Sequence, residues 1–163
     1  MRWILMISIG LLLTILAPPC FGQVTGTPGL NDYTVNGSFS GSTSCNIVVI
    51  PPASPLTLAV SGDPLTTVII IILVPVPGAG CPCTAGFAPF PPNCAGVQSL
   101  DILFGTPGCV SLLISGVTDA AGDYSVTAPS CPPSLRFSTQ AVLLGPAACP
   151  PPVWTQAYDV SCL

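Results

Sequence analysis

The chain has 163 residues, a formal net charge of −4 and no histidine, and only 5% of its residues are charged. Its two basic residues, Arg2 and Arg136, are too few to neutralise a nucleic-acid backbone or an anionic membrane surface, which excludes both as partners. Without histidine, the chain lacks the base of an ordinary serine or cysteine hydrolase. We therefore expect a protein that is not an enzyme.

Residues 1–22 have the three parts of a secretory signal peptide. A basic start precedes an apolar run from Trp3 to Ala17, and small residues lead to a cleavage point after Gly22. The run is shorter than the ~20 residues of a spanning helix, so we expect cleavage and no stable membrane span. An uncleaved anchor is the alternative. The mature protein should begin at Gln23 and be secreted, extracellular or held at the cell surface.

Residues 23–163 are the usual length of a single domain, and proline and glycine divide them into short segments rich in β-branched and aromatic residues. This spacing predicts an all-β fold, a two-sheet antiparallel sandwich of about nine strands, immunoglobulin-like, with disulfide-stapled loops. The expected strands are Tyr33–Phe39, Cys45–Ile50, Leu56–Val60, Thr66–Val74, Val97–Phe104, Cys109–Ser115, Tyr124–Thr127, Leu135–Leu144 and Trp154–Cys162.

Alternation along these segments predicts which side chains face the core. The expected inward residues are Leu56, Leu58, Val60, Leu135, Phe137, Ala141 and Leu143. The expected outward residues are Thr57, Ala59, Arg136, Ser138 and Gln140. In Val97–Phe104, Leu100, Ile102 and Phe104 should share one face and Asp101 should lie on the other.

The segment Thr66–Val74 has no polar face, because every residue from Val68 to Val74 is aliphatic. Alternate residues of a sandwich strand point away from the core, so the outer face of this strand needs a cover. The cover is either the proline-, glycine- and cysteine-rich loop at 75–96 or another chain. A long loop of this kind in a compact domain is usually functional or disordered, and disulfides can order it.

Cleavage after Gly22 removes Cys20 and leaves an even number of cysteines, which predicts a disulfide framework in an exported chain. The expected disulfide cysteines are Cys45, Cys81, Cys83, Cys94, Cys109, Cys131, Cys149 and Cys162. Their pairing stays open, except that Cys81 and Cys83 are too close for an easy mutual bridge. The missing histidine and the lack of Cys-x2-4-Cys pairs disfavour zinc, and no cofactor is expected.

Two sets of aspartates could carry chemistry. Asp119 and Asp123, in Asp-Ala-Ala-Gly-Asp-Tyr, form a weak calcium candidate, but calcium prefers six to eight oxygens and a plain hairpin turn explains the motif better. Asp101 and Asp159 could meet as a glycosidase-like acid and base pair. The scarcity of aromatic and polar partners disfavours that reading.

The C-terminal half contains Gly116-Val117-Thr118-Asp119-Ala120-Ala121-Gly122-Asp123-Tyr124-Ser125-Val126, then Pro132-Pro133-Ser134-Leu135 and Thr139-Gln140-Ala141. This run resembles short exported bacterial β-sandwich proteins of unknown function that have a Thr-Asp-Ala-x-Gly turn. The turn is also similar to the Thr-Asp-x-x-Gly-x-Tyr hairpin of transthyretin-like and other immunoglobulin-like modules. The resemblance implies an exported sandwich and transfers no catalytic residue.

These observations favour a non-enzymatic extracellular structural or surface-interaction domain whose partner is another copy of itself or another cell-surface component. The alternative is a carbohydrate-binding module, which would bind a glycan through aromatic residues exposed on one sheet face. The aromatic residues available for this are Tyr33, Tyr124, Trp154 and Tyr158, and we expect them to fill the core instead.

Overall fold

The computed structural model describes residues 32–38, 45–78, 83–84, 88–93, 96–102, 105, 107–144 and 152–163. The predicted signal peptide at 1–22 lies outside these residues. So do Phe104 and three of the predicted disulfide cysteines, Cys81, Cys94 and Cys149. The described residues contain no helix with the length and hydropathy of a membrane span.

The described part of the chain forms ten β-strands. They are β1 (Asp32–Val35), β2 (Asn46–Ile50), β3 (Leu56–Ser61), β4 (Thr67–Pro75), β5 (Ala88–Asn93), β6 (Gly96–Leu100), β7 (Cys109–Val117), β8 (Asp123–Ala128), β9 (Arg136–Leu144) and β10 (Val153–Cys162). Each of the nine predicted strands is present. The additional strand, β5, lies inside the region predicted to be a loop at 75–96.

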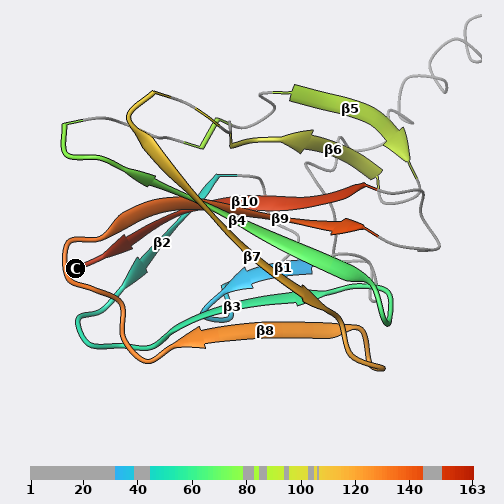
Figure 1. Ribbon diagram of the computed structural model, residues 1–163, viewed down its shortest axis with the longest axis horizontal. Helices are drawn as coiled ribbons and strands as arrows, with labels where there is room; N and C mark the ends of the chain where they lie inside the picture. Colours follow the sequence, from blue (N-terminus) through green and yellow to red (C-terminus); the bar gives the residue numbers. More distant parts are fainter. Residues whose placement is uncertain are drawn as a thin grey trace, which may run out of the picture.

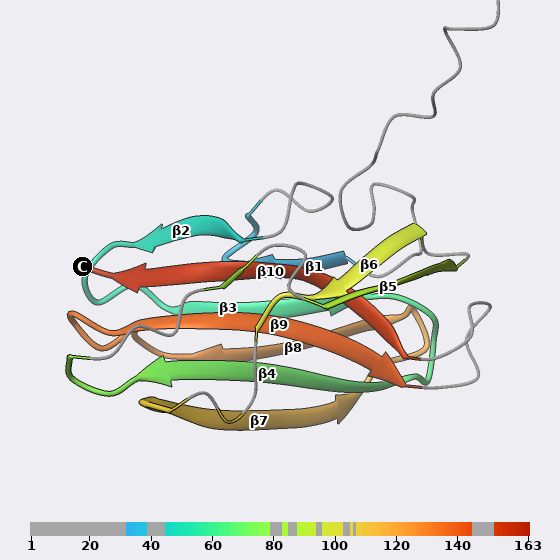
Figure 2. The same cartoon turned by 90° about the horizontal axis from the view of Figure 1, so that it is seen from above.

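The strands form an all-β sandwich, as predicted (Figure 1). One sheet has the order β1-β3-β8, and the other has the order β2-β10-β9-β4-β7, which can be followed strand by strand in Figure 2. A separate ribbon of β5 and β6 lies on the opposite side of the five-stranded sheet from β1-β3-β8. All pairs are antiparallel except β2 with β10, which is parallel. The immunoglobulin-like assignment stays a prediction.

The main core fills the space between the two sheets. Leu58 and Val60 of β3 face Phe137, Ala141 and Leu143 of β9 across it, all of them buried, and Leu56 and Leu135 pack at its margin. The predicted inward residues of these two strands are therefore confirmed. Burying apolar surface at roughly 25 cal/mol per Å² is the main force that holds the sheets together.

The outer face of β4 is covered by residues of the same chain. Ile71 and Leu73 are buried there in a second apolar cluster with Ile102 and Ala157. Cys83, Leu100, Cys109, Trp154 and Ile69 pack around this cluster. We call residues 83–84 and 96–102 the covering segment. The aliphatic run from Val68 to Val74 in β4 thus has an apolar cluster on each side, and residues of the same chain cover its outer face.

The covering segment also changes the environment of the outward residues of β9. Ser138 and Gln140 were expected to face solvent, yet both are buried. They lie on the outer side of the sheet, where the covering segment shields them from water. Asp101 follows β6 and is itself only 1% exposed. For Ser138 and Gln140, alternation predicted the correct face of the sheet but the wrong exposure to solvent.

A β-bulge in β10 shifts the alternation of that strand. The register with β9 slips between Trp154 and Ala157, so that Val153 and Tyr158 both face the main core although they are an odd number of residues apart. At the bulge, the Thr155 hydroxyl hydrogen-bonds the backbone of β9: it accepts from the Ala141 amide and donates to the Ala141 carbonyl. A bulge of this kind kinks the strand and redirects its side chains.

The turn between β7 and β8 joins the two sheets. The Thr118 hydroxyl donates to the Asp63 carbonyl and accepts from the Thr66 amide, which ties this turn to the one between β3 and β4. Gly122 has φ of +93° and lies directly against Gly62, whose amide donates to the Gly122 carbonyl at 2.9 Å. A side chain at Gly122 would collide with the Gly62 carbonyl oxygen.

Replacing Gly122 with alanine is therefore expected to reduce the free energy of unfolding by about 3 kcal/mol or more, because backbone strain and a backbone collision add together. Gly78 is the matched control, since it has φ of +86° and open space around it. Gly78→Ala should cost only about 1 kcal/mol. Urea unfolding of both variants measures the difference, and equal losses would contradict the close approach at Gly62.

Candidate functional site

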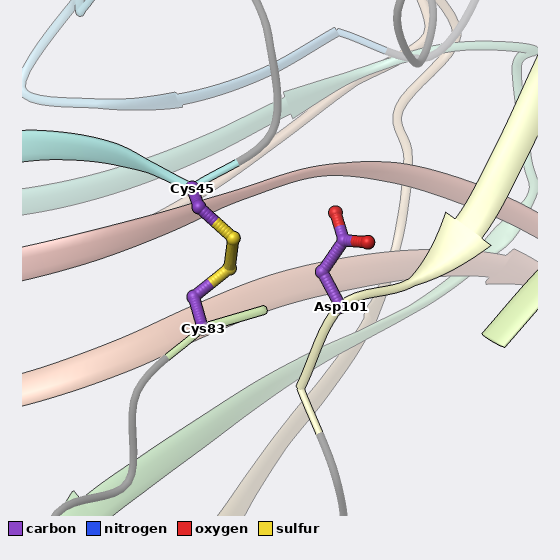
Figure 3. A group of neighbouring side chains, drawn as sticks. All are labelled: Cys45, Cys83 and Asp101. Atoms are coloured by element: carbon purple, nitrogen blue, oxygen red, sulfur yellow. A yellow bond between two sulfur atoms is a disulfide. The ribbon is translucent and has the colours of Figure 1, made fainter. Parts of the chain in front are cut away.

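The first candidate site is a group of possible metal ligands, Cys45, Cys83 and Asp101 (Figure 3). Their ligand atoms lie within 4.8 Å of one another. Cys45 and Cys83, however, form a disulfide that links residues 38 positions apart. Metals bind the thiolate form of cysteine, so the disulfide form offers no sulfur ligand of that type. The group instead fastens the covering segment to the residue before β2.

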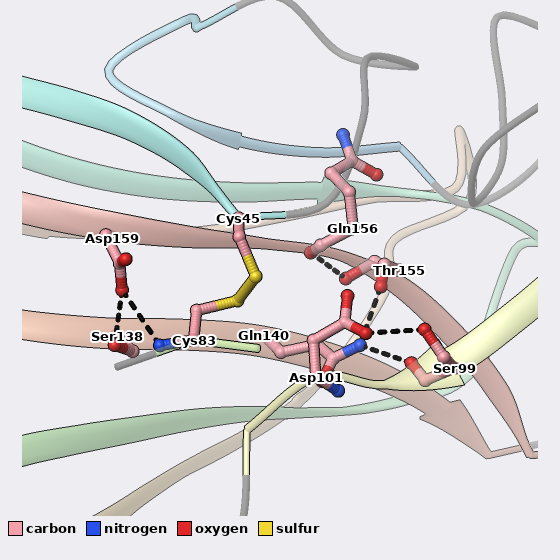
Figure 4. Close-up of a disulfide and its surroundings, with 9 residues drawn as sticks. All are labelled: Cys45, Cys83, Ser99, Asp101, Ser138, Gln140, Thr155, Gln156 and Asp159. Carbon is pink, nitrogen blue, oxygen red and sulfur yellow. Dashed lines mark hydrogen bonds between the residues drawn. A yellow bond between two sulfur atoms is a disulfide. The ribbon is translucent and has the colours of Figure 1, made fainter. Parts of the chain in front are cut away.

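A buried polar cluster surrounds this disulfide (Figure 4). Gln140 of β9 is its centre, because its side-chain amide donates to the carbonyls of Ser99 and Thr155 at 2.8 and 2.9 Å. Its side-chain oxygen accepts from the Asp101 amide at 3.0 Å. Gln140 therefore pairs with backbone groups of the covering segment on one side and with a backbone carbonyl of β10 on the other. These hydrogen bonds anchor the covering segment to the sheet.

The two aspartates considered as an acid and base pair have structural partners. Asp101 accepts a hydrogen bond from Ser99, and Asp159 accepts from the Ser138 hydroxyl and the Cys83 amide. Figure 4 shows the two carboxylates on either side of the Cys45–Cys83 disulfide. The Asp159 bond to the Cys83 amide holds the covering segment on β10, whereas the Asp101 carboxylate bonds Ser99 within the covering segment itself.

Asp119 and Asp123, the weak calcium candidates, are turn residues. The Asp119 carboxylate accepts from the amides of Asp123 and Ala121, and these two hydrogen bonds hold its pKa below the ordinary value. The Asp123 carboxylate accepts from the Ser61 hydroxyl at 2.7 Å. These contacts are typical of an Asx-type hairpin turn and account for both residues.

The aromatic residues that a glycan would need lie mainly in the core. Tyr33 and Tyr158 are completely buried, with ring centroids 5.7 Å apart in an edge-to-face arrangement. The Tyr158 hydroxyl donates to the Tyr33 carbonyl, and the Tyr33 hydroxyl shares a hydrogen bond with Thr139. Burial raises the pKa of Tyr33 well above its ordinary value, against the opposing effect of Thr139.

The other two aromatic residues are partly buried. Trp154 packs on the outer cluster of β4, and Tyr124 packs on the main core, where its ring lies over Gly116 of β7. The described aromatic side chains therefore serve packing, as expected, and do not line one exposed sheet face.

Two further disulfides involve described cysteines. Cys131 and Cys162 are buried in the main core and join the loop before β9 to the end of β10. Cys109 is also disulfide-bonded. The prediction that Cys83 does not pair with Cys81 is confirmed by its bond to Cys45.

The most distinctive surface is β7, an edge of the five-stranded sheet that sequence reasoning treated as an ordinary strand. Four of its aliphatic residues are about half exposed or more: Val110 (49%), Leu112 (50%), Leu113 (61%) and Val117 (55%). Leu112 lies opposite Ile72 and Leu113 opposite Ile71 in the register with β4, so the exposed side chains lie on both faces of the sheet. We call these four residues the β7 patch.

Two other edge strands of the sandwich, β8 and β2, differ from β7. Edge strand β8 exposes Asp123, Ser125 and Thr127, which are polar and solvated. Edge strand β2 exposes Ile47 (75%) and Val49 (53%) but has only five residues. Natural proteins usually protect sheet edges with charges, prolines or short strands. The nine residues of β7, Cys-Val-Ser-Leu-Leu-Ile-Ser-Gly-Val, contain neither charge nor proline.

Comparison with known proteins adds little to this description. No family model and no curated protein matches the chain. Among solved structures, it is similar to Escherichia coli alpha-2-macroglobulin activated by porcine elastase, at 13% identity and a TM-score of 0.39. The alignment covers 85% of this chain but only 13% of that structure, so the chain spans about an eighth of its length. A likeness at this level carries no argument, and the function has to be inferred from the residues themselves.

Proposed function

We propose that the protein is an extracellular, non-enzymatic domain that acts by contact, binding another protein surface through its sheet edge. The β7 patch carries the proposal, because an uncharged apolar edge of this length is costly to leave in water. The disulfides among the described cysteines support an oxidising compartment outside the cytosol. The hydrogen bonds that Asp159 and Gln140 make to the covering segment support a structural use of these two polar residues.

The alternative of a carbohydrate-binding module receives less support. Glycan platforms need aromatic faces open to solvent, and Tyr33 and Tyr158 are completely buried. Only Trp154 and Tyr124 remain, and they belong to opposite sides of the five-stranded sheet.

A surface-retention experiment tests the proposal. Purified, disulfide-bonded protein with a detection tag is added to producer cells that still make the protein, and the amount of tagged protein retained after washing is measured. We expect saturable retention that falls at least about tenfold in Leu113→Lys, since a lysine in an apolar contact must be desolvated. Ser125→Lys adds the same charge to the exposed face of β8 and should be retained like the wild type.

Retention that is absent, non-saturable or equal in Leu113→Lys and the wild type would contradict binding through this edge. Far-UV circular dichroism of each variant verifies that the sandwich is intact, and Leu113 is suited to the test because its side chain is 61% exposed.

A further inference from the structure

We propose that two copies of the chain associate through β7, aligned antiparallel so that Leu113 of one copy lies opposite Leu113 of the other. This inference rests on the proposed contact function and names its partner as a second copy. The five-stranded sheet ends at β7, and no described strand pairs with the side of β7 that faces away from β4. Adding a strand there would continue the sheet, and main-chain hydrogen bonds would supply much of the affinity.

The five central residues of β7, 111–115, are nearly symmetric about Leu113. Leu112 and Ile114 flank it on one face, and Ser111 and Ser115 lie two residues away on its own face. In an antiparallel pair with a two-fold axis at Leu113, each aliphatic residue of this centre faces an aliphatic residue and each serine faces a serine. A two-fold interface has to be self-complementary in this way, which favours a second copy over an unrelated strand.

Exposed aliphatic side chains lie on both faces of β7, at its centre and towards both of its ends. Leu113 and Val117 extend on the outer face, and Val110 and Leu112 on the inner face, each about half exposed or more. A strand paired with β7 at a distance of about 5 Å would cover the exposed side chains on the outer face and on the inner face at the same time. Electrostatic repulsion between copies is small, because β7 has no charged residue and the whole chain carries a net charge of only −4.

A charge-exchange experiment tests the pairing. Sedimentation velocity is run on the disulfide-bonded wild type and on Leu113→Lys and Leu113→Asp, at concentrations from roughly 10 to roughly 500 µM. We expect a monomer–dimer equilibrium for the wild type and at least about tenfold weaker association for each variant, because like charges would face each other across the axis. An equimolar mixture of the two variants should restore the dimer, since lysine then faces aspartate.

Ile47→Lys is the control, because Ile47 is exposed to 75% on the opposite edge of the same sheet. It should dimerise like the wild type. Loss of association in Ile47→Lys, or growth of the wild type into filaments, would mean that β7 binds β2 of another copy and would overturn the two-fold pairing. A wild type that stays monomeric throughout, or a mixture that fails to restore the dimer, would overturn it as well.

The two proposals fail separately. If the wild type is monomeric while cell-surface retention still depends on Leu113, the self-pairing is wrong and the contact function stands with a different partner. If the dimer forms but the cells retain no protein, the self-pairing stands and the surface function is wrong.

Discussion

Replacing Cys45 and Cys83 together with alanine is expected to lower the free energy of unfolding by roughly 4 kcal/mol and to expose the outer face of β4. The first effect follows from the chain entropy that a bridge across 38 residues removes from the unfolded state. The second follows from the position of Cys83, which packs against the cluster that contains Ile71 and Leu73 as part of the covering segment. Urea unfolding measures the stability, and binding of an apolar dye measures the exposure.

The matched control is the double replacement of Cys131 and Cys162, which are 31 residues apart. The similar loop length predicts a similar loss of roughly 3–4 kcal/mol. This bridge lies between the sheets, so its removal should leave the covering segment in place and hydrogen exchange on the outer side of β4 slow. Equal exposure of β4 in both double variants would contradict a specific role of the Cys45–Cys83 bridge in holding the cover.

Gln140→Leu is expected to be the most damaging single replacement in the polar cluster, lowering the free energy of unfolding by about 3–5 kcal/mol. Leucine roughly keeps the volume but removes the hydrogen-bonding partner of the Asp101 amide and of the Ser99 and Thr155 carbonyls. Each buried polar group left without a partner costs about 1–3 kcal/mol. Faster hydrogen exchange at the Asp101 amide, relative to the global unfolding rate, would locate the damage at the covering segment.

Ser125→Ala serves as the comparison for Gln140→Leu, because Ser125 is an exposed polar residue in the opposite sheet. Its replacement should change stability by no more than about 0.5 kcal/mol. A loss below about 1 kcal/mol in Gln140→Leu would mean that the covering segment is held by its apolar contacts and its disulfide alone.

The sequence was sufficient to predict the fold class and the strands, since local alternation and turn residues carry that information. The boundaries of β3, β4 and β9 agree with prediction to within one residue at each end. Strand β5 was missed because its Ala-Pro-Phe-Pro-Pro-Asn sequence contains the residue that ordinarily excludes a strand. Proline is compatible with β5 because this ribbon has only two strands, so one side of each needs no ladder partner.

The misjudged features depend on contacts between residues distant in the sequence. Gln140 has the pattern of a solvent-facing residue, and only the approach of Ser99 and Asp101 from another part of the chain buries it. In β10, simple alternation would not predict which side chains face the core, because the register with β9 shifts between Trp154 and Ala157. The β7 patch could have been noticed from its uncharged, proline-free sequence, but whether a strand lies at an edge is a property of the sheet order.

The position of β10 also constrains how the protein reaches this fold. β10 lies inside the five-stranded sheet, between β9 and β2, and it pairs Asn46–Ile50 with residues 158–162, more than a hundred positions later. The sheet cannot be completed until this last strand has joined it. Contacts of such long sequence separation make folding slow, in the millisecond-to-second range for comparable β-proteins. During that interval β2 and β9 both present open edges, so a chain emerging from a ribosome or translocon gains its full sheet only after residue 162 is free.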